Sequence, residues 1–225
     1  MAVYVVSDNS LGAVADAIRA RSGINEGIVY KDGFTNAIGG LSDGGMTPQD
    51  WLSGNVVTEL SYDGNSLQKY ALYSQSALTS LSLPNVQAIG DYALASLSAY
   101  TGAIVIPKAT TINASAFHST KMSSLDIRGT SIAGAAFYSC SNLTVVVLRN
   151  TSLVTLASGN AFTGTWFASD DASKPTTLYV PSALISAYQS ATNWSTVLAR
   201  AGKSIVAIEG SYYETHYADG TAIDN

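Results

Sequence analysis

The sequence has few of the residues that proteins use for covalent chemistry and metal binding. Its 225 residues include one cysteine, Cys140, and two histidines, His118 and His216. A single cysteine cannot form an internal disulfide, and a structural zinc site needs more ligands than these three residues supply. A hydrolytic triad needs a serine, a histidine and an acid that converge, whereas the two histidines lie far apart in the sequence. We therefore expect a non-enzymatic protein without catalytic residues, metal or cofactor.

Charged residues and long apolar runs are also scarce. Charged residues make up 12% of the chain, the net charge is -5, and no cluster of Lys or Arg occurs. The electrostatic footprint of a nucleic-acid binder is therefore missing. No run of about 18 apolar residues is present, so we expect no membrane insertion. The apolar fraction of 47% is high enough for a substantial core and excludes general disorder.

The first 45 residues have the pattern of a small helical module. The start has no basic residue and only a short apolar run ended by Asp8, so it does not have the pattern of a secretory signal, which was either removed or never present. Apolar residues recur at helical spacing over residues 10–21 and 32–41. Their apolar faces exceed what two helices can bury alone, so we expect them to serve assembly with other proteins. The predicted assembly residues are Leu11, Val14, Ile18, Phe34 and Ile38.

A repeat follows a segment rich in Gly and Pro. Ala followed by Leu or Phe recurs at intervals of 20 to 25 residues, and a short apolar-x-apolar triplet follows each pair. The pairs begin at Ala71, Ala93, Ala116, Ala136 and Ala161, and the triplets at Leu81, Ile104, Leu125, Val146 and Leu178. Such a unit cannot enclose a core alone, but stacked units can place their strands in one parallel sheet. We therefore predict a linker and N-terminal cap at 46–66, a solenoid at 67–181, and a C-terminal cap and tail at 182–225.

The middle residue of each triplet is predicted to point outward, because side chains alternate along a strand. These residues should form an exposed line on the sheet, with Arg128 and Arg149 among its few charges. The line consists of Ser82, Val105, Asp126, Val147 and Tyr179. It is either a binding strip for a glycan or a protein, or an ordinary solvated sheet face.

The repeats resemble the BspA-type leucine-rich repeats, whose units read approximately Ile-Gly-x-x-Ala-Phe-x-x-Cys-x-x-Leu-x-x-Ile-x-Leu-Pro. The nearest copies are residues 89–94, Ile-Gly-Asp-Tyr-Ala-Leu, and 136–143, Ala-Phe-Tyr-Ser-Cys-Ser-Asn-Leu. Leu replaces Phe in two copies, and Arg149 stands where Pro is usual. The resemblance implies an α/β solenoid of short parallel strands with a binding role, and it places Cys140 at a position where a buried thiol packs between coils.

Aromatic residues outside the repeat are further candidates for binding. The inserted segment 165–175 carries Trp166 and Phe167, which either contact a partner or cap the end of the solenoid. The tail carries Tyr212, Tyr213 and Tyr217, which either contact a receptor or pack along another chain. The adjacent carboxylates of residues 170–171 lack the spacing of a calcium loop and are predicted to be solvated charge.

Residues 11–23 and 30–38 resemble a short helical segment near the start of many tail and other virion proteins of phages infecting Gram-positive bacteria. Similar proteins also end in a segment like residues 180–194. The resemblance implies a virion surface protein that is attached to other virion proteins by its N-terminal module and binds a glycan or protein on the host surface. A homo-oligomer such as a trimer is the expected form. The alternative is a bacterial cell-surface or secreted adhesin with the same repeats.

Overall fold

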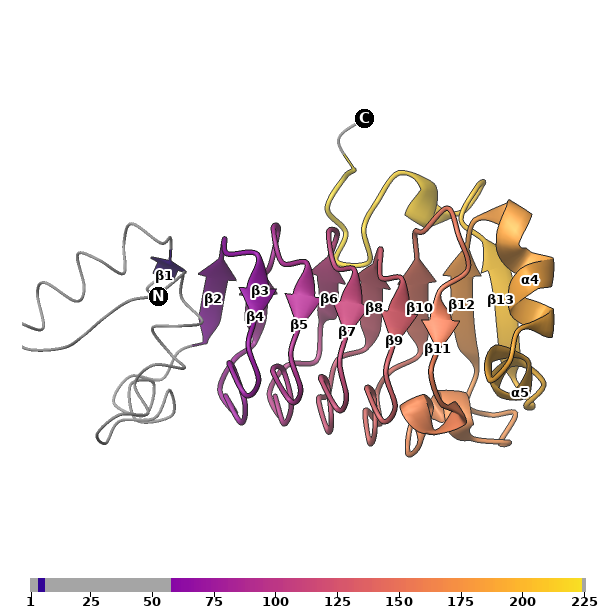
Figure 1. The fold of residues 1–225 in the computed structure, drawn as a ribbon, viewed down its shortest axis with the longest axis horizontal. Helices are drawn as coiled ribbons and strands as arrows, with labels where there is room; N and C mark the ends of the chain where they lie inside the picture. Colours follow the sequence, from indigo (N-terminus) through magenta and orange to yellow (C-terminus); the bar gives the residue numbers. More distant parts are fainter. Residues whose placement is uncertain (1–3, 7–57, 224–225) are drawn as a thin grey trace, which may run out of the picture.

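Short parallel strands stack into a solenoid in the computed structural model, which describes residues 4–6 and 58–223 (Figure 1). A three-stranded sheet begins the stack, with β1 (Tyr4–Val6), β2 (Glu59–Tyr62) and β4 (Ser80–Ser82). The long-strand sheet continues it, with β6 (Ala103–Ile106), β8 (Ser124–Ile127), β10 (Val145–Leu148), β12 (Thr176–Val180) and β13 (Lys203–Ala207). The short-strand sheet faces both, with β3 (Ser66–Leu67), β5 (Ala88–Ile89), β7 (Thr111–Ile112), β9 (Ser131–Ile132) and β11 (Thr155–Leu156).

The apolar triplets form the long strands, as predicted. Leu125 in β8 pairs with Ile104 in β6 and with Val146 in β10, so equivalent residues of successive repeats lie side by side. All three side chains are buried. The five apolar residues at the second position of the short strands form another buried column: Leu67, Ile89, Ile112, Ile132 and Leu156. The core therefore lies between the two ladders of parallel strands, as the predicted solenoid requires.

The Ala-Leu and Ala-Phe pairs lie in the turns between the short and long strands. Neighbouring turns are joined by backbone hydrogen bonds, such as the one from the Phe117 amide to the Ala136 carbonyl at 2.9 Å and from the Phe137 amide to the Ala161 carbonyl at 2.9 Å. The rings of Phe117, Phe137 and Phe162 stack at centroid distances of 5.4 and 5.1 Å. A small alanine at this position lets the backbones approach, while the aromatic ring fills the interior.

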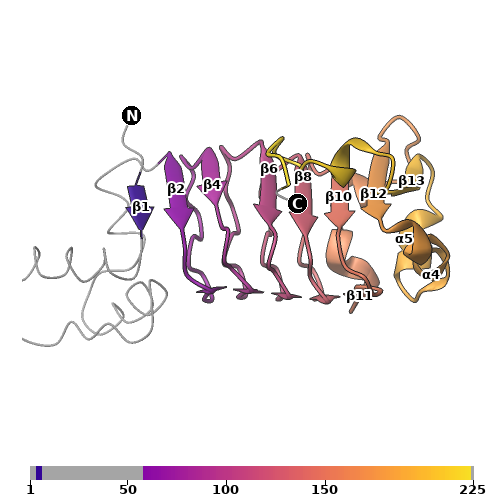
Figure 2. The same cartoon turned by 90° about the horizontal axis from the view of Figure 1, so that it is seen from above.

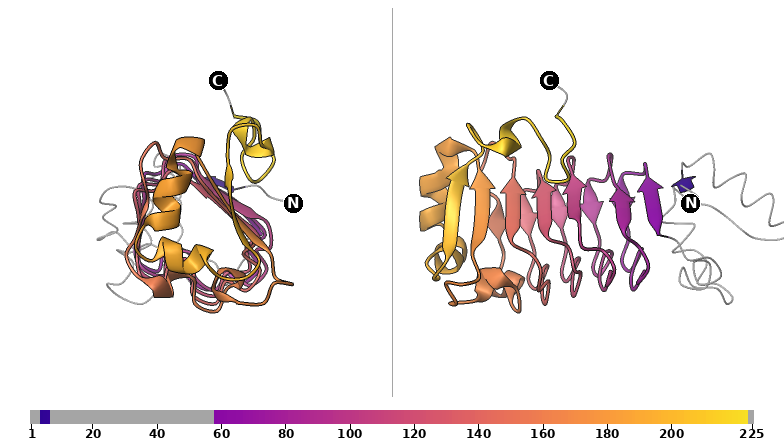
Figure 3. Two further views of the ribbon diagram at one scale, coloured as in Figure 1. Left: turned by 90° about the vertical axis from the view of Figure 1, so that its right-hand side faces the viewer. Right: turned by 180° about the vertical axis from the view of Figure 1, so that it is seen from behind.

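Helices cover the C-terminal end of the stack. Two short helices, α4 (Ile185–Ser190) and α5 (Trp194–Leu198), follow the turn η4 (Ser182–Leu184), and Figure 3 shows them across the end of the coil. Trp194 is buried and donates from its indole nitrogen to the Val154 carbonyl at 2.8 Å. Tyr188 is also buried, and its hydroxyl accepts from the Val154 amide at 3.1 Å. The helices thus shield the apolar edge that the last coil leaves exposed.

The predicted N-terminal helices and most of the linker lie outside the described residues. This applies to all five predicted assembly residues: Leu11, Val14, Ile18, Phe34 and Ile38. Of the first 57 residues only β1 is described, and it pairs in parallel with β2, with Tyr4 opposite Leu60. In the described part of the chain, no helix has the length and apolar character needed to cross a bilayer.

Candidate binding surfaces

The predicted outward line along the long strands is interrupted. Ser82 is exposed, and Val105 and Tyr179 are half-buried. Asp126 and Val147 are fully buried, so the prediction that they lie on an open surface is wrong. Residues 211–223, which we call the C-terminal strap, lie across this face of the sheet (Figure 2). The sheet face is therefore covered at its centre and open toward its N-terminal end.

Asp126 and Arg149 form an ion pair beneath the C-terminal strap. The Nε and Nη2 atoms of Arg149 donate to the two carboxylate oxygens of Asp126 at 2.6 and 2.7 Å. Arg149 also donates to the carbonyls of Tyr213 and His216 at 2.7 and 2.8 Å, and the Ala218 amide donates to Asp126 at 3.0 Å. The pair therefore fastens the strap to β8 and to the residue that follows β10.

Aromatic contacts extend this attachment on both sides. The Tyr213 ring meets the ring of Tyr179 on β12 edge to face, with centroids 4.5 Å apart. The Arg149 guanidinium lies 5.0 Å from the centre of the Tyr217 ring. Burial raises the pKa of the Asp126 carboxyl, while the hydrogen bonds and charge of Arg149 act in the opposite direction. Of the predicted binding residues of the tail and sheet, Ser82, Arg128 and Tyr212 are exposed.

The inserted segment packs mainly against the end of the core. Its turn η3 (Trp166–Ala168) places Phe167 in the interior, where its ring lies 5.1 Å from that of Phe162. The prediction of Phe167 as a surface contact is therefore wrong, and its other interpretation, as a cap of the core, fits the structure. Trp166 is half-buried. The exposed Asp170 carboxylate pairs with Arg200 at 2.8 Å, which accounts for one of the two adjacent acids.

A series of aromatic residues, three of them exposed, lies along the turns. We call it the aromatic row, and it consists of Tyr70, Tyr73, Tyr92, His118 and Tyr138. The Tyr70 and Tyr92 rings stack at 5.4 Å, and the His118 and Tyr138 rings stack at 5.1 Å. Tyr92 and His118 join the two pairs at 6.0 Å. The row thus runs continuously over four coils, on the edge that Figure 1 shows below the strands.

The aromatic row was not predicted from the sequence, although a signal was present. Each member lies immediately before or after an Ala-Leu or Ala-Phe pair, as with Tyr70 beside Ala71 and Tyr138 beside Phe137. His118 is half-buried between the rings of Tyr92 and Tyr138. A search for aromatic residues at the edge of each repeat would have found the row.

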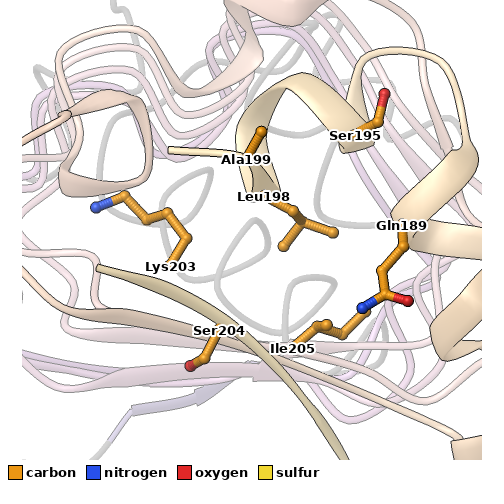
Figure 4. Close-up of a pocket in the computed structure, with 7 residues that line it drawn as sticks. All are labelled: Gln189, Ser195, Leu198, Ala199, Lys203, Ser204 and Ile205. Atoms are coloured by element: carbon orange, nitrogen blue, oxygen red, sulfur yellow. The ribbon is translucent and has the colours of Figure 1, made fainter. Parts of the chain in front are cut away.

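A shallow hollow of about 490 Å³ lies in the C-terminal cap between α4, α5 and β13. Leu198 and Ile205 provide its apolar lining, and Figure 4 shows the Lys203 side chain directed away from Leu198. The Lys203 ammonium donates to the carbonyls of Lys174 and Ala201 at 3.1 and 2.9 Å. The Lys203 ammonium is therefore already hydrogen-bonded within the C-terminal cap. The described residues contain no group of three potential metal ligands.

The Cys140 thiol lies in the core between two coils. Its side chain is fully buried, and the Sγ atom donates to the Phe117 carbonyl at 2.8 Å. Burial raises its pKa to about 12. The position is that of a packed, un-ionised thiol, as the resemblance implied.

Together, the parallel ladders, the stacked turns and the apolar columns define a leucine-rich repeat solenoid. Residues 65–178 match the BspA type leucine rich repeat region, in six copies. The chain therefore belongs to the BspA-type leucine-rich repeat family. No curated protein and no solved structure matches the chain. A domain of this kind indicates a role in protein binding or adhesion, and such solenoids are typically non-enzymatic.

Proposed function

We propose that this chain is a phage virion structural protein that attaches through its N-terminal module and binds the host surface through the aromatic row. The observation that carries the binding role is the row itself, a continuous series of packed rings, three of them exposed, fixed to a stack of coils. Tyr70, Tyr73 and Tyr138 are 47%, 40% and 39% exposed. Rigid aromatic side chains dominate binding energy because they bury much area at little entropic cost.

The chemistry of the row favours an uncharged part of a host glycan or protein. Its members supply ring surface for apolar packing and hydroxyl or imidazole groups for hydrogen bonds. The Lys69 ammonium lies 5.2 Å from the Tyr70 ring centre, so one nearby cation is already engaged. Weak binding by one row becomes strong when many copies of a virion protein act together.

The virion role is supported by the N-terminal resemblance described above. In this proposal residues 1–45 contact other virion proteins, and the chain forms a homo-oligomer at the virion surface. The alternative is a cell-surface or secreted bacterial adhesin that uses the same row. The two differ in where the protein is found, not in how the repeats bind.

Two measurements test the proposal. Mass spectrometry and antibody-labelled electron microscopy of purified particles should detect the protein on virions; label confined to the cell envelope would contradict the virion role and favour the adhesin.

Purified full-length protein should bind host cells, and combined replacement of Tyr70, Tyr92 and Tyr138 by Ala should weaken binding at least about tenfold. Tyr212→Ala is the matched control, because Tyr212 is 57% exposed and lies in the strap, away from the row.

A further inference from the structure

The C-terminal strap lies on a polar site of the long-strand sheet, formed by the side chains of Asp126 and Arg149. Asp126 has no exposed surface and the Arg149 side chain is only 7% exposed, yet both belong to the outward face of the sheet. The strap covers both side chains: the Ala218 amide, 92 residues from Asp126, bonds its carboxylate, and the carbonyls of Tyr213 and His216 accept from Arg149. The Asp126–Arg149 pair lies on the outward face of the sheet and is covered by a segment distant in the sequence. This arrangement resembles a binding site occupied by a bound peptide.

The site recognises main-chain groups. Two carbonyls, of Tyr213 and His216, accept from Arg149, and one amide, of Ala218, donates to Asp126. Tyrosine rings lie at each side, against Tyr179 and over the guanidinium. Any protein loop that presents two carbonyls, one amide and a neighbouring aromatic ring in this arrangement satisfies the same groups.

The C-terminal strap has internal hydrogen bonds of its own, so it can separate from the sheet face as one folded segment. It is a small hairpin with its own hydrogen bonds, including the Tyr217 amide to the Thr221 carbonyl at 2.8 Å and the Ile223 amide to the Thr215 carbonyl at 2.9 Å. Just before it, Glu209 is held by the Ser182 amide at 2.8 Å. Gly210 lies between them with a φ of 77° and no atom near the position of a Cβ. A pivot at Gly210 would break the two hydrogen bonds that span it, from the Ser211 amide and hydroxyl to the Ile208 carbonyl at 3.0 and 2.7 Å.

Departure of the strap leaves no isolated buried charge. Asp126 and Arg149 hold each other through two hydrogen bonds, and this pair becomes exposed to water when the strap leaves. A lone buried charge would make opening costly, whereas an exposed bidentate pair is stable in water. The sheet face is therefore compatible with both the covered and the open state.

We propose that the Asp126–Arg149 pair is a binding site for an exposed loop of a partner protein, and that the C-terminal strap is its occupant within the chain until the partner loop replaces it. The inference goes beyond the proposed function. The aromatic row lies on the turns below the strands in Figure 1, and the strap lies above them. Binding at the aromatic row and binding at the Asp126–Arg149 pair can therefore be tested independently.

The test uses the full chain with a protease recognition sequence inserted at Gly210. After purification the connection is cut, and a fluorescent synthetic peptide of residues 211–223 is added while its anisotropy is measured. The cut protein should bind one peptide per chain, reversibly. The uncut protein should bind at least about tenfold more weakly, because its own strap competes at a high effective concentration.

Peptide variants locate the site without any risk of misfolding the protein. N-methylation at Ala218 removes the amide that donates to Asp126 and should weaken binding at least about tenfold. N-methylation at Tyr212, which precedes the contacts with the ion pair, is the matched control and should leave binding nearly unchanged. Equal binding of both variants would overturn the site at Asp126.

Two further outcomes would contradict the proposal. If the cut segment stays in place and the labelled peptide never exchanges, the strap is a fixed part of the fold. If the uncut chain forms dimers that the peptide dissociates, the occupant is the strap of a second copy and not a partner loop. Host binding by the aromatic row is measured separately and is unaffected by either result.

Discussion

At the scale of single residues, Cys140 shows how packing controls chemistry. The thiol is fully buried and its pKa is raised to about 12. At about pH 8 its thiolate fraction is then lower by about a thousandfold than that of a free cysteine, before steric protection is considered. We expect a thiol reagent to leave Cys140 unlabelled in the native protein and to label it fully after denaturation. Mass spectrometry measures the labelled fraction in both cases. Labelling of native protein at the rate of a free thiol would contradict this burial.

The turns place several non-glycine residues in the left-handed region, and Ala135 with a φ of 56° is the simplest to test. An L-residue is strained there, and glycine is not. Ala135→Gly should therefore be neutral or raise the free energy of unfolding by up to about 1 kcal/mol. The control is Ala114→Gly in the neighbouring turn, which is not among the left-handed residues and should cost about 0.5–1 kcal/mol. Urea titration distinguishes them, and equal losses in both variants would disprove the strain argument.

At the scale of the elements, the stacked turns carry much of the stability. The Phe137 ring lies between those of Phe117 and Phe162, and all three are fully buried. Phe137→Ala should lower the free energy of unfolding by about 3–5 kcal/mol, because it opens a cavity in the middle of the stack. Phe137→Leu should cost less than about 1.5 kcal/mol, since Leu72 and Leu94 occupy the same position in other coils. Similar losses for the two variants in urea titrations would show that the ring stack, and not the filled volume, is essential.

The helical cap makes the fold sensitive to alkali. Burial raises the pKa of Tyr188 in α4 to about 12, from an ordinary value of 10.0. The folded state therefore holds the proton more tightly than the unfolded state, so this stabilisation is complete below pH 10 and is lost as the pH rises from 10 to about 12. The loss amounts to about 3 kcal/mol.

Circular dichroism across this pH range measures the effect. Tyr188→Phe should be less stable near neutral pH, because the Val154 amide loses the hydroxyl that accepts from it. The same variant should lose less stability between pH 10 and about 12 than the native protein does. Tyr100, whose pKa burial also raises to about 12, accounts for part of the remaining loss. Parallel curves for the variant and the native protein would contradict the assignment to Tyr188.

At the scale of the whole molecule, low charge should make host binding insensitive to salt. The net charge of the chain is -5, and the proposed binding surface consists mainly of tyrosine rings. Raising the salt from about 0.05 M to about 0.5 M shortens the range of electrostatic attraction but leaves apolar contacts in place. The affinity of the purified protein for host cells should therefore change less than about threefold. A loss of two orders of magnitude would point to a charged surface in place of the aromatic row.

The repeat could be predicted from the sequence because its determinants are local. The spacing of Ala71, Ala93 and Ala116 and of the apolar triplets predicts both the strands and the buried turns, and the structure confirms them. The burial of Asp126 could not be predicted, because it depends on Ala218, 92 residues away. For Phe167 the sequence left two alternatives, a partner contact or a cap of the solenoid, because its segment interrupts the repeat; the structure buries the ring at the end of the stack.

The C-terminal strap also affects how the molecule resists a mechanical load. Hydrogen bonds between neighbouring strands run along the axis of the stack, so tension along that axis pulls directly on them. The strap and the Asp126–Arg149 pair tie β8, β10 and β12 together from outside. The pairing of long strands is interrupted between β4 and β6, where the short-strand sheet and the turns hold the coils together. A pulling force applied to the two ends should therefore separate the solenoid first at this interruption, while the tied C-terminal coils stay intact.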